Sequence, residues 1–132
     1  MKHLMAVLFA ALLIGDAPAA FAQEVSFNRD VFPILSGRCF VCHGPNAKDR
    51  KAKLRLDRAD GAEGAYRIHK DLAAIKPGSL KDSALWYRIT TSDVDERMPP
   101  PEAHKKPLSK KEQAIIKSWI EAGAPYETFW AF

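Results

Sequence analysis

The sequence predicts a mostly α-helical fold in one small domain. Apolar residues recur at helical spacing in segments 25–37, 83–89 and 109–120, and no clear strand pairs are visible. The chain has 132 residues, which suits one domain once an N-terminal leader is removed. We assign that domain to residues 23–125.

Residues 1–22 have the features of a cleaved signal peptide. Lys2 supplies the positive start, residues 4–14 form an apolar run, and Ala20-Phe21-Ala22 provides an A-x-A cleavage site. The alternative is a membrane anchor, but the apolar run is too short to cross a bilayer. We therefore expect an exported protein, periplasmic or otherwise extracytoplasmic, that begins near Gln23 and has no membrane span after cleavage.

The first helical segment has four apolar residues on one face: Phe27, Val31, Ile34 and Leu35. Pro33 limits where this helix begins, because proline fits only the first turn. Asp30 as N-cap satisfies that limit, whereas a start at Ser26 or Asn28 forces a kink. Both alternatives lead the helix into the segment that follows Gly37.

That segment is Cys39-Phe40-Val41-Cys42-His43, in a chain with no other cysteine. CxxCH is typical of c-type haem attachment, in which both sulfurs bond one porphyrin and the histidine binds its iron. A disulfide between Cys39 and Cys42 would close a very small loop and stabilise little. A zinc site lacks an obvious fourth ligand. The motif therefore predicts one haem c held covalently by Cys39 and Cys42, with His43 as an axial ligand.

A positively charged run follows in segment 48–58. A docking patch for an acidic electron-transfer partner is one interpretation, because such fields raise association rates. A solvated loop is the more ordinary one, and we favour it. Within the run, Leu54 and Leu56 alternate with polar residues, which predicts a short extended piece packed inward. His69 stands in a polar run and has little weight as a ligand.

The second helical segment follows a turn at Pro77-Gly78, with Asp82 or Ser83 as its N-cap. Its apolar face contains Leu85, Trp86 and Ile89. We expect Trp86 in the core or in the wall of the cofactor pocket rather than on a recognition surface.

Met98 precedes three consecutive prolines, which favour a stiff polyproline II backbone. Alone, this methionine would be an ordinary buried residue. In a chain whose iron needs a sixth ligand, the His/Met pattern favours Met98 as the second axial ligand. His104 competes for this role, but its lysine-rich surroundings predict that it faces solvent.

The last helical segment begins with a capping box of Ser109 and Glu112 and is followed by Gly123 and Pro125, which favour its end. Its apolar face consists of Ile115, Ile116, Trp119 and Ile120. Residues 126–132 (YETFWAF) form an aromatic tail. It either folds back over the domain or begins a linker to a further domain that is missing here.

Several of these motifs together resemble one known family. They are VSFNRDVFPILSGRCFVCHGPN, LRLD, PGS, MPPP before the capping box, and a GAP end. In this combination the chain resembles the planctomycete-type cytochrome c domain over residues 25–132. The resemblance implies a cytochrome c fold, a small helical bundle around one haem c on Cys39 and Cys42, with His43 and Met98 as axial ligands. It also implies a module at the N-terminus of a much longer exported protein.

We expect an electron-transfer domain without catalytic residues of its own, acting with an unidentified redox partner or adjoining domain. A haem enzyme is the alternative, either peroxidase-like or the electron-accepting part of a dehydrogenase, if Met98 leaves the iron open. A thiol–disulfide domain is disfavoured because those sites occur in a βαβ pattern. The net charge of +4 is too small to indicate nucleic-acid binding.

Overall fold

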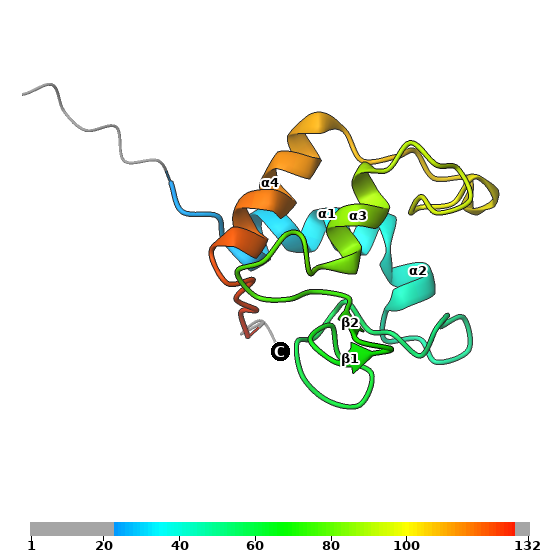
Figure 1. Cartoon of the computed structure of the whole chain (residues 1–132), viewed down its shortest axis with the longest axis horizontal. Coiled ribbons are helices and arrows are strands. Elements are labelled where there is room, and N and C mark those ends of the chain that lie inside the picture. Colours follow the sequence, from blue (N-terminus) through cyan, green and yellow to red (C-terminus); the bar gives the residue numbers. More distant parts are fainter. Residues whose placement is uncertain (1–22, 129–132) are drawn as a thin grey trace, which may run out of the picture.

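The computed structural model describes residues 23–128, in which regular structure is mostly helical with one short two-stranded sheet. The elements are η1 (Phe27–Val31, a π-helical turn), α1 (Phe32–Arg38), α2 (Phe40–His43), β1 (Ile68–His69), β2 (Leu72–Ala73), α3 (Ala84–Thr90), η2 (Pro101–Ala103, a 3-10 turn) and α4 (Lys110–Glu121). Figure 1 shows α1, α3 and α4 together on one side and the sheet among long loops on the other. The signal peptide expected at residues 1–22 lies outside the described residues.

The first helical segment begins at Ser26 and changes its pitch before Pro33. The Ser26 hydroxyl accepts a hydrogen bond from the Arg29 N–H at 3.3 Å, which makes it the N-cap. The π-helical turn η1 follows, and α1 then starts with Pro33 in its first turn, where no N–H donor is needed. The helical segment therefore begins at Ser26 and not at Asp30. The kink expected for that start is the π-helical turn ahead of Pro33.

The hydrophobic core lies where these helices meet. Trp119 of α4 is fully buried, and its ring centroid lies 5.6 Å from that of Phe27 and 5.2 Å from that of Tyr126. The other buried members are Val31, Ile34, Leu35, Leu56, Ala65, Ile75, Leu85, Ile89, Leu108, Ile116, Ile120 and Ala124. Trp86 and Ile115 are half-buried against this cluster, so the apolar faces predicted for all three helical segments do face the core.

Helix α4 begins and ends where the sequence predicts. The Glu112 N–H donates to the Ser109 hydroxyl at 3.2 Å, and the Ser109 N–H donates to the Glu112 carboxylate at 2.7 Å, which completes the capping box. Gly123, one residue beyond the C-cap, has a φ of +97°, a left-handed conformation that glycine adopts without strain. These two local signals therefore determine where the helix begins and ends, without any long-range contact.

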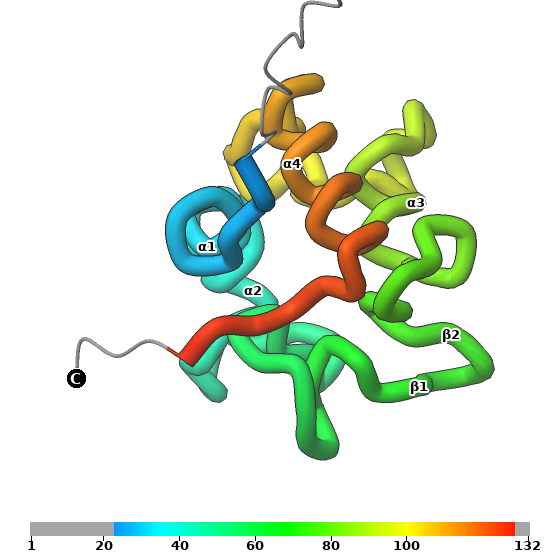
Figure 2. Tube along the Cα trace, turned by 90° about the vertical axis from the view of Figure 1, so that its left-hand side faces the viewer, coloured from blue at the N-terminus to red at the C-terminus, as the bar shows by residue number. Residues whose placement is uncertain are grey.

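After α4 the chain returns across the molecule past α1 (Figure 2). The Tyr126 hydroxyl donates to the Leu56 carbonyl at 3.0 Å, and its ring centroid lies 4.5 Å from that of Phe27. The Glu127 carboxylate accepts from the Phe27 N–H at 2.7 Å, which satisfies a free donor at the start of η1. Tyr126 and Glu127 thus pack against the domain, while residues 129–132 of the aromatic tail lie outside the described part.

No pattern in the sequence predicts the sheet. Strands β1 and β2 pair antiparallel, with His69 opposite Leu72. The two residues between them, Lys70 and Asp71, have φ values of +51° and +68°. Two-residue hairpins of this kind favour Asn-Gly or Asp-Gly, so Lys-Asp does not predict one. Within residues 23–128, no helix is long and apolar enough to span a membrane.

Candidate haem site

The CxxCH motif forms one helical turn directly after α1. The Cys39 N–H donates to the Leu35 carbonyl at 2.8 Å, after which α2 starts at Phe40. The N–H groups of Cys42 and His43 donate back to the Cys39 carbonyl at 3.1 and 2.8 Å. Both cysteines are half-buried and free of a disulfide. The motif thus occupies a single compact turn, as it must if one ligand is to engage all three side chains.

All four residues predicted to hold haem line two cavities that have Cys39 and Met98 in common. The larger cavity, about 290 Å³ in volume, is lined by Cys39, His43 and Met98 among others. The smaller one, about 110 Å³, is lined by Cys39, Cys42 and Met98 together with the adjacent prolines. The fold therefore brings a methionine from far along the chain next to the motif. His104, the competing ligand, is exposed and lines neither cavity.

The walls of the larger cavity are mostly apolar. They come from the extended piece after the motif, from the hairpin and from α3: Ala52, Leu54, Leu56, Leu72, Ala73, Ala74, Ala84 and Leu85. Leu54 and Leu56 pack inward as predicted, and the Leu56 N–H donates to the His43 carbonyl at 2.8 Å. No acidic residue lines this cavity, whereas two arginines and two histidines do. Such a cavity suits a ligand that has an apolar body and anionic groups, and a haem porphyrin has both.

The His43 imidazole is largely buried, and its Nδ1 atom has no hydrogen-bond partner. Burial lowers the pKa of His43, and an interaction with the backbone of Lys51 opposes this shift by a smaller amount. The loop after the motif is held close, because the Lys51 N–H donates to the Cys42 carbonyl at 2.7 Å. A neutral imidazole with an unpaired buried nitrogen is the form in which histidine binds a metal. Among the described residues, no three His, Cys, Asp or Glu side chains cluster to hold a metal ion by themselves.

Burial raises the pKa of the Cys39 thiol to about 12, and the positive charge of Arg38 opposes this shift. Redox-active and nucleophilic cysteines need the opposite shift, because the thiolate is the reactive form. Cys39 thus has an environment unlike that of a thiol–disulfide exchange centre. A thiol held in an apolar wall agrees better with a covalent bond to a bound group.

Helix α3 fixes the position of Met98. The Met98 N–H donates to the Arg88 carbonyl at 2.9 Å, and the Arg88 guanidinium donates to the Glu96 carbonyl at 3.0 Å and pairs with the Glu96 carboxylate at 2.8 Å. After Met98, Pro100 has the polyproline II geometry that the sequence predicts, with φ −72° and ψ 156°, whereas Pro101 begins the turn η2. The loop that carries Met98 is thus tied to a helix whose other side packs in the core.

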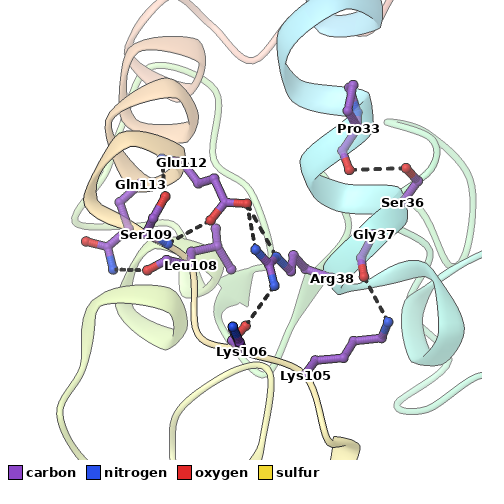
Figure 3. A network of polar contacts seen from close by, with 10 residues as sticks. All are labelled: Pro33, Ser36, Gly37, Arg38, Lys105, Lys106, Leu108, Ser109, Glu112 and Gln113. Atoms are coloured by element: carbon purple, nitrogen blue, oxygen red, sulfur yellow. Dashed lines mark hydrogen bonds and ion pairs between the residues drawn. The ribbon is translucent and has the colours of Figure 1, made fainter.

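A second set of polar contacts ties the end of α1 to the segment that precedes α4 (Figure 3). The Arg38 guanidinium pairs with the Glu112 carboxylate at 2.9 Å and donates to the Lys106 carbonyl at 3.3 Å. The Lys105 ammonium donates to the Gly37 carbonyl at 2.9 Å. Because Arg38 directly precedes Cys39, and Lys105 follows the Met98 loop, these contacts join the two segments that carry the predicted ligands.

Sequence reasoning missed three polar side chains of the larger cavity: Arg67, His69 and Arg88. His69 received little weight because its neighbours are polar. The hairpin, which has no sequence signal, brings it to the cavity together with Leu72. Trp86, for which a place in the pocket wall was one alternative, packs against the core instead and lines neither cavity.

A comparison with known families supports the resemblance. The family model described as Planctomycete cytochrome C matches residues 39–102. Residues 39–102 thus match the planctomycete cytochrome c family. The matched segment runs from the first cysteine of the motif past Met98, so it includes all four predicted haem-binding residues. Membership of a cytochrome c family indicates haem binding.

Among curated proteins, the chain is similar to "Hydrazine synthase subunit alpha" of Kuenenia stuttgartiensis, with 26% identity over 127 residues. The alignment covers 80% of this chain and 16% of that protein. The domain therefore spans a small part of the relative's length. No solved structure matches the chain.

Proposed function

We propose that this domain binds one haem c and transfers electrons. Cys39 and Cys42 form the two thioether bonds, and His43 and Met98 bind the iron from its two sides. When bound, the haem supplies one-electron redox chemistry, while the chain sets access to it and its potential. The observation that carries the proposal is the convergence of all four side chains on two cavities with shared walls.

The chain's own residues each have a defined task in this proposal. The buried, uncharged His43 offers a nitrogen, and the loop after the motif keeps its ring in place. Met98 closes the opposite side, which keeps small molecules from the metal, and a thioether ligand raises the potential relative to two histidines. The apolar wall around Leu54, Leu56 and Leu85 excludes water.

Expression in a cell that matures c-type cytochromes tests the attachment. We expect a coloured product with the mass of the mature chain plus one haem, starting at Gln23 if residues 1–22 are removed as a signal peptide. A double variant with Cys39→Ala and Cys42→Ala should lose the covalent haem. A colourless wild-type product with the mass of bare polypeptide would refute the proposal.

Absorption spectroscopy tests the sixth ligand. Ferric His/Met haem gives a weak far-red band, and Met98 is the only methionine outside the predicted leader. We expect this band in the wild type, its loss in Met98→Ala, and its retention in the matched control His104→Ala, because His104 is exposed and lines neither cavity. A wild type without the band means that Met98 does not bind.

A haem enzyme is the second candidate, and the name of the curated relative, a synthase subunit, is the observation that favours it. In that case the iron has an open side, and His69 is a candidate for a functional group because it lines the cavity that Met98 also lines. Carbon monoxide added to the reduced protein separates the two functions. An open iron binds it at once, whereas an iron closed by Met98 binds it only after that bond is lost.

A further inference from the structure

We propose that Arg67 binds a carboxylate of the haem and thereby helps to set its redox potential. This inference rests on the proposed haem binding and goes beyond it, because it assigns a role to a residue outside the CxxCH motif and the axial ligands. The observation behind it is an arginine in the wall of the larger cavity that lacks a counterion. Arg67 lines that cavity, and its Nε atom is buried without a hydrogen-bond partner.

Arg67 is one of three described arginines, with Arg58 and Arg97, that are in no ion pair, and of these three it alone lines the larger cavity. Five described arginines are in ion pairs with carboxylates: Arg29, Arg38, Arg50, Arg55 and Arg88. Of the two arginines that line the larger cavity, Arg88 is therefore already neutralised by Glu96, at 2.8 Å. Arg67 has no such partner, and its one side-chain hydrogen bond is a long contact of 3.5 Å from Nη2 to the Lys53 carbonyl.

The surroundings of Arg67 supply no counterion from the protein. The cavity walls contain no aspartate or glutamate, and most of them are alanine and leucine. Arg67 itself is half-buried, but a guanidinium with a buried, unpaired nitrogen in such a place is costly unless an anion accompanies it. A porphyrin combines an apolar ring, which suits these walls, with two carboxylates, which suit a planar guanidinium that can donate two parallel hydrogen bonds.

The backbone holds Arg67 ready for this contact. Its N–H donates to the Gly64 carbonyl at 3.2 Å, and the preceding residue, Tyr66, donates its N–H to the Ala59 carbonyl at 3.0 Å. The following residue starts β1, whose partner strand contributes Leu72 to the cavity wall. Little backbone freedom therefore remains to be lost when a carboxylate binds.

Arg67→Gln, Arg67→Lys and Arg58→Gln, each matured with haem attached, test the proposal. Arg58 is the matched control, because it is exposed, is in no ion pair and lines neither cavity. In Arg67→Gln we expect shifted carboxylate bending bands in the resonance Raman spectrum. We also expect a lower midpoint potential, since the unpaired carboxylate then stabilises the ferric state. Arg67→Lys should shift both in the same direction by less, and Arg58→Gln should leave both unchanged.

Two outcomes overturn the proposal: Raman bands and potential of Arg67→Gln equal to those of the wild type, or shifts of the same size in Arg58→Gln. If Arg67→Gln fails to mature, the wild type still decides. A carboxylate bond predicts a slowly exchanging Arg67 Nε–H resonance in the reduced protein, and a rapidly exchanging one overturns the proposal. A wild type without any attached haem is a different result, because it refutes haem binding itself and is recognised by its lack of colour.

Discussion

The ion pair between Arg38 and Glu112 should couple α1 to α4 by about 1 kcal/mol. Its side chains are 28% and 23% exposed, so the pair lies between surface and interior. Exposed pairs contribute about 0.2–1 kcal/mol, and hydrogen bonds to charged groups about 1.5–3 kcal/mol. A double-mutant cycle of Arg38→Gln and Glu112→Gln, followed by urea unfolding and far-UV circular dichroism, measures the coupling directly.

The same pair predicts a dependence on pH with a definite sign. Burial raises the pKa of Glu112, but hydrogen bonds from the Ser109 backbone and from Arg38 outweigh it, so the pKa lies below its usual value of 4.5. A carboxyl with a lowered folded-state pKa contributes stability above its unfolded pKa and loses it as pH falls through the folded one. The coupling should be complete at neutral pH and decline in the acidic range below 4.5. A coupling below about 0.3 kcal/mol at neutral pH, or one that is unchanged in acid, would contradict this reasoning.

Four further substitutions should have distinct effects. In Gly44→Ala the new Cβ would overlap the Phe40 backbone, so we expect a loss of about 1–3 kcal/mol and less attached haem. Gly37→Ala, whose Cβ meets nothing within 4 Å, should leave urea stability unchanged or raise it. Trp119→Ala removes a fully buried ring and should cost about 3–5 kcal/mol in urea unfolding; a loss below about 1 kcal/mol would show that the core lies elsewhere. Tyr126→Phe should cost about 1 kcal/mol. Burial raises the pKa of Tyr126 in the folded state, so wild-type stability should decline as pH rises beyond the unfolded value of 10.0. Tyr126→Phe should lack this decline. Equal alkaline unfolding of both proteins would contradict the reasoning.

The helices could be predicted because their signals are local, and the proposed ligand set depends on residue types that have few alternatives in this chain. Ser109 and Glu112 are three residues apart and cap the same helix. Met98 stands out because it is the only methionine outside residues 1–22 and precedes a rigid proline run. In each case, residues that are close in sequence make the contact that matters, or a single residue type has few alternatives. The helical faces follow for the same reason, since periodicity alone decides which side chains point inward.

Features that depend on distant parts of the chain left no such signal. Arg38 meets Glu112 across 74 positions, and each would otherwise look like an ordinary surface charge. The hairpin at β1 and β2 has a Lys70-Asp71 turn in place of the glycine or asparagine that marks such turns. Because that hairpin brings His69 and Leu72 to the cavity, missing it also meant missing part of the cavity wall.

The molecule has a regular half and an irregular half, and this division bears on how a cofactor would act on it. Most of the core around Trp119 comes from η1, α1, α3 and α4. The larger cavity, in contrast, takes much of its wall from segments 52–56 and 67–74, which contain only the two short strands. Loops of this kind have few ladder hydrogen bonds and open at low free-energy cost. A group that bonds to Cys39 and Cys42 and fills that hollow would stabilise this half more than the core. Its binding free energy would then add to that of folding by mass action. Because Cys39 follows directly on α1, the helical core positions the CxxCH turn, while the loop segments form the opposite wall of the cavity.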